Sequence, residues 1–194
     1  RFNPNIIIMA SALKQVDTCE LSPYESVQTN ILGINNIVDV VEEDLGRLSN
    51  LETVLMVSTD KACSPTNVYG MCKSVAERLV LVKSKTTNTV KFVAVRYGNV
   101  LDSRGSILPL FNHQVRCQDF LTLTHGDMTR FLMTLDDSVD LILTTIEKGK
   151  SGETWIPKLN AMRIIDLAEI YAEMHDKKIK VTGIRPGEKI HESL

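Results

Sequence analysis

Short apolar runs alternate along this chain with longer segments in which apolar residues recur every three or four positions. A short run of apolar and β-branched residues is typical of a strand buried in a parallel sheet, and the longer spacing is typical of an amphipathic helix. The pattern predicts strands at residues 5–10, 54–57 and 91–96, separated by helices at residues 23–43 and 67–83. Strands and helices in this order predict an α/β fold with a parallel sheet and right-handed crossovers.

The pattern becomes less regular after Gly98. Further helices are predicted at residues 107–117, 136–148 and 164–175, and short strands at residues 121–124, 153–156 and 178–182. A soft boundary falls near residues 99–104. We therefore predict a sheet domain at residues 1–100 and a smaller α/β region at residues 101–194.

Composition and charge exclude several classes of protein. The chain is 43% hydrophobic and 24% charged, which is typical of a globular domain, and a net charge of −2 offers no basic surface for nucleic acid or an anionic membrane. No apolar stretch reaches the length of a membrane span, and no signal peptide is visible. The four cysteines form no CxxC pair, so we expect reduced thiols and a cytoplasmic protein. The four histidines are scattered, and we expect no metal site.

The sequence lacks a glycine-rich nucleotide fingerprint. Doubly wound, Rossmann-like folds carry this fingerprint after their first strand, with an acidic ribose contact about 20 residues later. The ten glycines form neither GxGxxG nor GxxGxxG. The predicted fold is therefore a Rossmann-like doubly wound parallel sheet that lacks its N-terminal glycine-rich βαβ unit. We expect this chain alone to bind a dinucleotide weakly or not at all.

Polar residues at the end of one predicted strand, and in the helix that follows it, are the main candidates for chemistry. Thr59, Asp60 and Lys61 follow the strand at residues 54–57, where ligands gather in parallel sheets. Tyr69 and Lys73 lie four residues apart and so share one helix face, where an ammonium can lower the pKa of a phenol. This set predicts oxidation of an alcohol with proton transfer beside it. The simpler interpretations are an ordinary amphipathic helix pair and a solvated turn.

Other residues suit a nucleotide ligand or a purely structural role. After the first strand, Ala10, Ala12 and Lys14 would allow either a dinucleotide or a helix to approach closely, and Asn30 would contact the cofactor or tie down a loop. Guanidinium groups pair with phosphate oxygens. A diphosphate is therefore the ligand expected for Asn99, Arg104, Arg130 and Arg185. Glu188 would contact a ribose or cap a turn.

Several segments, in this order, resemble the UDP-N-acetylglucosamine 4,6-dehydratases of the polysaccharide biosynthesis CapD-like family, within the extended short-chain dehydrogenase/reductases. The matching segments are residues 10–16, 29–33, 58–62, 65–70 with Lys73, 96–100, 103–106, 128–131 and 185–189. The Asp-Lys pair after Thr59 is similar to the branch that inverts C5. Gln15 and Cys63 depart from the family pattern, which often has His and a small apolar residue at these positions.

The resemblance implies an NAD-dependent enzyme, a lyase, that converts UDP-N-acetylglucosamine to a 4-keto-6-deoxy sugar nucleotide. It implies that Tyr69 takes the proton of the 4-hydroxyl, that Lys61 removes the C5 proton and that Asp60 protonates the departing 6-hydroxyl. Thr59 would bind the 4-oxygen, and Lys73 the nicotinamide ribose.

The same resemblance assigns binding partners. It implies NAD rather than NADP, held by Ala10, Ala12, Lys14, Asn30, Tyr69 and Lys73. It implies a UDP-sugar substrate, held by Asn99, Arg104, Arg130, Arg185 and Glu188. It also implies a homo-oligomer that pairs through the helices at residues 23–43 and 67–83.

Two alternatives remain open. A UDP-sugar 4-epimerase needs Tyr69 and Lys73 but not Asp60 and Lys61. A non-catalytic binding or assembly module derived from such an enzyme would need none of these groups to react. Measured NAD binding would separate the module from the enzymes.

Overall fold

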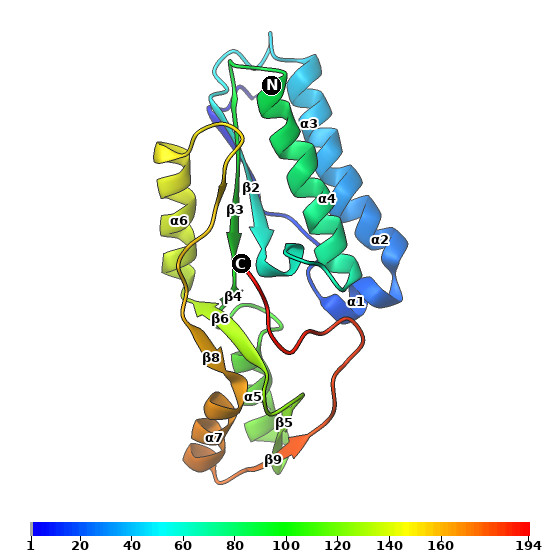
Figure 1. The fold of residues 1–194 in the computed structure, drawn as a ribbon, viewed down its shortest axis with the longest axis vertical. Helices are drawn as coiled ribbons and strands as arrows, with labels where there is room; N and C mark the ends of the chain where they lie inside the picture. Colours follow the sequence, from blue (N-terminus) through cyan, green and yellow to red (C-terminus); the bar gives the residue numbers. More distant parts are fainter. Residues whose placement is uncertain (1) are drawn as a thin grey trace.

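The computed structural model describes residues 2–194 and places a four-stranded parallel sheet at the centre of the upper part of the molecule (Figure 1). Its strands lie in the order β1-β2-β3-β7, with bounds β1 Ile6–Met9, β2 Thr53–Thr59, β3 Lys91–Tyr97 and β7 Thr154–Trp155. All neighbouring strands in it are parallel. The predicted α/β fold with a parallel sheet is confirmed, and every strand predicted in this part is present.

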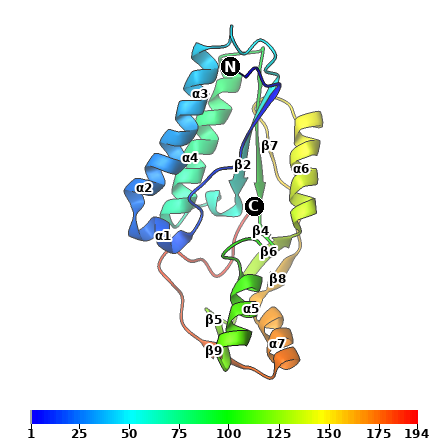
Figure 2. The same ribbon diagram turned by 180° about the vertical axis from the view of Figure 1, so that it is seen from behind.

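Helices cover both faces of this sheet (Figures 1 and 2). One face carries α4 (Val68–Val82) and a continuous rod made of α2 (Pro23–Val27), a π-helical turn (Gln28–Leu32) and α3 (Gly33–Glu43). The other face carries α6 (Leu135–Lys148). The helices predicted at residues 23–43, 67–83 and 136–148 are therefore confirmed.

Alternating side chains of the strands form a separate core with each helical layer, as the pleat of a buried strand requires. Val54, Met56 and Phe92 pack with Val38 and Val80 on the side of α3 and α4. Their sequence neighbours Leu55, Val93 and Val95 point the other way. On that side they pack with Leu141, Ile142 and Ile146 of α6. The helices cover both faces of β2 and β3, whereas β1 leaves Ile6 and Ile8 exposed at the edge of the sheet.

The lower part of the molecule contains small sheets with two helices. Strand β5 (Phe120–Leu123) pairs with β9 (Lys178–Val181), and β6 (Thr129–Met133) lies between β4 (Asn99–Val100) and β8 (Ala161–Arg163). Helices α5 (Ile107–Cys117) and α7 (Ile164–His175) pack on this part through a core of Phe111, Leu121 and Ala168. The short strands β4, β6 and β8, and the helix α1 (Val16–Leu21), are elements that the hydrophobic pattern did not predict.

The chain passes between the upper and lower parts more than once. Helix α6 and strand β7 follow residue 100 in the sequence but belong to the upper part, because β7 is a strand of the upper sheet and α6 packs on its face. The last segment then runs from β9 back to the end of β2, as Figure 1 shows in red. The division into domains at residues 1–100 and 101–194 stays a prediction. Within residues 2–194, no helix is long and apolar enough to cross a membrane.

Candidate active site

The carboxyl end of β2 turns sharply and places three polar side chains together. A short 3₁₀ turn, Asp60–Ala62, follows Thr59, whose hydroxyl donates to Asp60 Oδ1 at 2.9 Å. Lys61 Nζ lies 3.1 Å from the same oxygen. Asp60 is fully buried, so its carboxylate depends on these two donors. The structure therefore brings together the acid and the amine that the sequence placed side by side.

Gly70 allows the helix with Tyr69 and Lys73 to approach this turn. A Cβ atom at position 70 would lie 2.2 Å from the Lys61 carbonyl oxygen, which is closer than any side chain can pack. Asn67 caps the same helix end, because its Oδ1 accepts from the Gly70 amide at 2.7 Å. The start of α4 is therefore fixed directly against the Asp60–Ala62 turn.

Tyr69 and Lys73 are both buried near the start of α4. Burial raises the pKa of Tyr69, and the negative charge of Asp60 raises it further, against a smaller opposing effect of a hydrogen bond with Thr59. The expectation that Lys73 lowers this pKa is therefore wrong for the structure as described. The Lys73 ammonium donates to the carbonyl oxygen of Val57 at 2.6 Å. Burial lowers the pKa of Lys73 to about 8, with Glu77 opposing the change.

Asn30 ties down the loop that follows β1. Its side-chain amide exchanges two hydrogen bonds of 2.9 Å with the backbone of Leu13, accepting from the amide and donating to the carbonyl. This is the loop-holding role that the sequence left open. The loop itself exposes Ala10, Ala12 and Lys14 at the same edge of the sheet as Asp60, and their contact with a cofactor stays a prediction.

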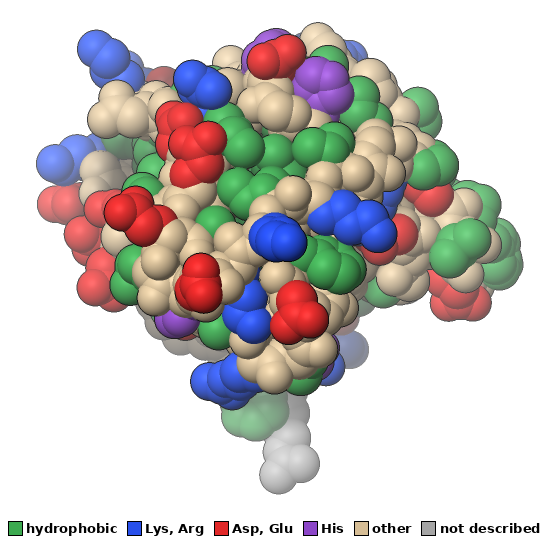
Figure 3. Space-filling view, turned by 90° about the horizontal axis from the view of Figure 1, so that it is seen from below, with side chains coloured by type: hydrophobic (Ala, Val, Ile, Leu, Met, Phe, Trp, Pro, Cys, Tyr) green, Lys and Arg blue, Asp and Glu red, His purple; other side chains and the backbone are tan. Residues whose placement is uncertain are grey.

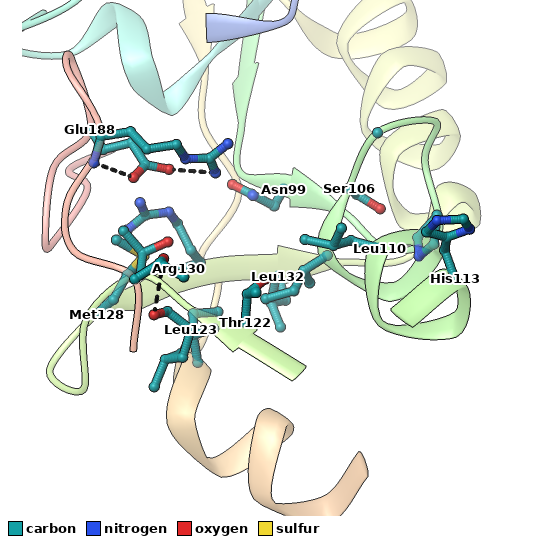
Figure 4. Close-up of a pocket in the computed structure, with 17 residues that line it drawn as sticks. Asn99, Ser106, Leu110, His113, Thr122, Leu123, Met128, Arg130, Leu132 and Glu188 are labelled. Carbon is teal, nitrogen blue, oxygen red and sulfur yellow. Dashed lines mark hydrogen bonds and ion pairs between the residues drawn. The ribbon is translucent and has the colours of Figure 1, made fainter. Parts of the chain in front are cut away.

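A cavity of about 670 Å³, a volume usual for a ligand pocket, is lined by residues of the lower part of the molecule and of the final segment (Figure 4). Among the described residues, Thr59, Asp60, Lys61, Tyr69 and Lys73 are not in its wall, but Asn99, which is, lies 3.5 Å from Lys61 Nζ. Figure 4 shows Arg130 and Glu188 on one side of the cavity, Leu110 and His113 on the other, and Asn99 between them. Of the predicted substrate residues, the wall contains Asn99, Arg130, Arg185 and Glu188. As described for residues 2–194, the wall does not include Arg104, which is exposed beside Gly105.

The arginines at the cavity already have partners within the protein. Arg130 donates to the carbonyl oxygens of Lys189 and Ile190 at 2.9 and 3.0 Å, so it holds the final segment of the chain. Arg185 pairs with Glu188 at 2.9 Å, and Glu188 also accepts from the Arg185 amide, as expected for a residue that caps a turn. A guanidinium group has five N–H donors, so these contacts leave donors for a ligand.

Sequence reasoning missed Glu192 at the site and gave Lys189 no role there. Glu192 is buried, with its carboxylate 3.6 Å from Lys61 Nζ and 3.1 Å from Lys189 Nζ. Glu192 lies outside the matching segments and Lys189 ends one of them, and both reach the site only through the return of the final segment to β2. The end of the molecule below this site carries acidic, basic and apolar side chains in a mixed arrangement (Figure 3).

The sequence profile described as "Polysaccharide biosynthesis protein" matches residues 1–194. The chain belongs to this polysaccharide biosynthesis family. One curated relative, UDP-glucose 4-epimerase of Rickettsia typhi, is 42% identical in an alignment of 193 positions that covers 97% of this chain and 55% of the relative. A protein of Methanocaldococcus jannaschii described as an uncharacterized membrane protein is 41% identical, over 98% of this chain and 59% of its own length. The chain thus spans less than two thirds of these relatives.

Solved structures show the same fold. The X-ray structure of Pen from Bacillus thuringiensis is 36% identical and superposes with a TM-score of 0.88, over 97% of this chain and 60% of that chain. DesIV, a dTDP-glucose 4,6-dehydratase of Streptomyces venezuelae with NAD and TYD bound, is 18% identical with a TM-score of 0.85, over 98% of this chain and 64% of that chain. The Rossmann-like α/β fold predicted from the sequence is confirmed by this likeness.

Proposed function

We propose that the complete protein containing this chain catalyses the NAD-dependent 4,6-dehydration of UDP-N-acetylglucosamine, with inversion at C5. The observation that carries this proposal is the contact of 3.1 Å between Lys61 Nζ and Oδ1 of the buried Asp60 at the carboxyl end of β2. Dehydration needs a base at C5 and an acid at the 6-hydroxyl, and this contact supplies one of each. The motifs around the pair, and the family to which the chain belongs, support the choice of a nucleotide sugar.

The residues at this edge fit a nicotinamide cofactor. Small exposed side chains at Ala10 and Ala12 would let a dinucleotide approach the backbone, and Ser58 Oγ is buried at the same edge with no hydrogen-bond partner among residues 2–194. NAD, when bound, supplies the hydride acceptor for C4 and returns the hydride to C6. Lys73 would hold the ribose beside the nicotinamide, with the remaining contacts from Lys14, Asn30 and Tyr69. NAD-bound DesIV supports a nicotinamide cofactor of this kind.

The proton transfers can be assigned to the residues of the site. One proton can pass from Lys61 to Asp60 across their contact, which leaves an amine base and a carboxylic acid. Lys61 then removes the C5 proton as the 6-hydroxyl leaves as water with the proton of Asp60. Thr59 hydrogen-bonds the 4-oxygen.

Tyr69 acts first in this scheme, on the proton of the 4-hydroxyl. Its raised pKa means that the phenol is protonated in the structure as described. To act as a base it must first lose that proton, so its role requires that ligand binding lower this pKa. Positive charge brought close to the ring would have this effect.

The cavity supports binding of the diphosphate. Asn99, Arg130 and Arg185 contribute polar groups to its wall, and spare guanidinium donors suit phosphate oxygens. Glu188 would contact the ribose, and Arg104 would reach the ligand only after movement of its exposed loop. We further propose a cytoplasmic location for the complete protein. We also propose that it assembles through the faces of α2, α3 and α4, because these helices expose the apolar side chains of Tyr24, Val40, Met71 and Val75.

A UDP-sugar 4-epimerase is the second candidate, because the curated relatives from Rickettsia carry that name. The test is NMR spectroscopy of UDP-N-acetylglucosamine incubated with the complete protein and NAD. Dehydration gives a new C6 methyl signal. If only the C4 epimer forms, the dehydratase proposal is wrong and the epimerase is correct.

A further inference from the structure

Glu192 is a buried carboxylate that the proposed reaction does not yet use. Its side chain is 2% exposed, and its two oxygens lie 3.6 Å from Lys61 Nζ and 3.1 Å from Lys189 Nζ. A carboxylate is removed from water at high cost, and it is stable in such a place only with paired charges. The position of Glu192 therefore links the last segment of the chain to the candidate base.

The Lys61 ammonium is surrounded by three oxygens from three parts of the structure. Asp60 Oδ1 comes from the turn after β2, Asn99 Oδ1 from β4 at 3.5 Å, and Glu192 Oε1 from the final segment. An ammonium group has three N–H donors, so each oxygen can face one of them. Three separate anchors fix the direction of a side chain that is otherwise long and flexible.

The final segment is held by contacts that do not involve Glu192. Arg130 donates to the carbonyl oxygens of Lys189 and Ile190, and Asn67 donates to the carbonyl oxygen of Gly187 at 2.9 Å. The Thr129 amide also donates to the Ile190 carbonyl oxygen, at 3.0 Å. The backbone before Glu192 is therefore anchored to both parts of the molecule, and the carboxylate is presented to Lys61 from a fixed position.

We propose that Glu192 is a positioning residue that holds Lys61 Nζ at the reaction centre and stabilises the ammonium formed when Lys61 takes the C5 proton. The inference rests on the proposed function only for the task of Lys61. In that step the C5–H bond breaks, an N–H bond forms on Nζ, and the new positive charge lies beside the Glu192 carboxylate. Glu192 touches neither substrate nor cofactor in this scheme.

The first experiment measures the position of Lys61 without the reaction. The complete protein is reductively methylated with formaldehyde and a borohydride reagent, and mass spectrometry follows Lys61 relative to exposed Lys85. Glu192→Gln keeps the shape of the side chain but removes its charge, so the amine is released and its labelling rises about tenfold, as for the loss of one charged hydrogen-bond partner. Unchanged labelling of Lys61 would overturn the inference.

Lys189→Met is the matched control. It removes the other partner of Glu192 but leaves the contact between Glu192 and Lys61, so Lys61 labelling should stay at the wild-type rate. Equal increases in Lys189→Met and Glu192→Gln would mean that anchoring of the segment, and not the carboxylate, positions Lys61. Glu192→Asp, which keeps the charge on a shorter side chain, should give labelling between wild type and Glu192→Gln.

The second experiment separates the steps of the reaction. In a single turnover, Glu192→Gln should still reduce the nicotinamide at the wild-type rate but form the C6 methyl product about tenfold more slowly or worse. The absorbance of the reduced nicotinamide should then persist, and Glu192→Asp should restore part of the rate. Equal loss of both steps would overturn the positioning role. If the wild-type protein forms no methyl product, the proposed function fails, while the labelling result still decides whether Glu192 positions Lys61.

Discussion

Replacing Lys61 by methionine tests the candidate site most directly. The variant keeps an unbranched side chain but loses the ammonium that lies 3.1 Å from Asp60 and 3.6 Å from Glu192. The Asp60 side chain is fully buried, and breaking a buried ion pair costs about 3–5 kcal/mol because the remaining charge has no partner. The Lys61 side chain is 18% exposed, so solvent screens part of this interaction, and Glu192 keeps Lys189. We therefore expect the free energy of unfolding to fall by about 2–3 kcal/mol.

A double variant checks the origin of this loss. Asp60→Asn removes the carboxylate charge but can still accept from the Thr59 hydroxyl, so adding it to Lys61→Met removes the unpaired charge. The double variant should be more stable than Lys61→Met, and its loss should be smaller than the sum of the two single losses by about 1 kcal/mol or more. Urea denaturation of the four proteins gives these values. Strictly additive losses would refute the buried pair.

The same Lys61→Met variant should separate the chemical steps. Loss of a general base slows its step by a factor of about 10²–10⁴. Elimination should therefore nearly stop, while oxidation at C4 remains possible and the absorbance of the reduced nicotinamide accumulates. Cofactor affinity, measured by calorimetry, should not change. Loss of both nicotinamide reduction and cofactor binding would contradict the assignment of Lys61 as the C5 base.

Three further predictions follow from other parts of the structure. Gly70→Ala should lower the free energy of unfolding by about 1–3 kcal/mol, because its Cβ would meet the Lys61 carbonyl oxygen. Gly33→Ala, whose Cβ would have its nearest neighbour at an ordinary contact distance of 3.5 Å, should be neutral or stabilising, and equal effects of the two variants in urea denaturation would contradict this. Burial lowers the pKa of Lys73 from 10.5 to about 8, so the unfolded chain binds this proton more tightly than the folded one and stability rises with pH across that interval. The stability of wild type relative to Lys73→Met should therefore increase by about 3 kcal/mol from pH 8 to pH 10.5, and parallel profiles would rule this out. Val75→Glu, on the exposed face of α4, should convert the proposed oligomer of the complete protein to monomers in sedimentation; a wild-type protein that is already monomeric at micromolar concentration would refute the proposed interface.

Elements with a long hydrophobic pattern could be predicted from the sequence, but several short ones could not, although the two-residue strand β7 was predicted. The helices α5 and α7 begin and end at the predicted residues, because each carries several turns of apolar spacing. Strands β4 and β8 contain two and three residues, which is too short for any periodicity to appear. Strand β6 contains the charged residue Arg130, which is buried because its guanidinium donates to carbonyl oxygens of the returning final segment. Tertiary contacts, and not local preference, form these strands.

The candidate site divides in the same way. Thr59, Asp60 and Lys61 could be found because they are adjacent in the sequence and end an apolar strand. The raised pKa of Tyr69 could not be predicted from the sequence. Helical spacing shows that Lys73 shares a face with Tyr69, but it shows neither how deeply Tyr69 is buried nor that Lys73 donates to the carbonyl oxygen of Val57. Glu192 could not be found either, since its contact with Lys61 joins residues that are far apart in the sequence.

The return of the final segment also affects how the site forms during folding. Strands β1, β2 and β3 and the helices between them can assemble through contacts between consecutive elements, but the surroundings of Lys61 include Glu192, and the closure of so long a loop is slow. A molecule in which only the upper sheet is folded would lack two of the three oxygens around the Lys61 ammonium, those of Asn99 and Glu192. Such an intermediate would carry the candidate base without the groups that direct it. Catalytic competence would therefore appear last, after the two parts of the molecule have joined.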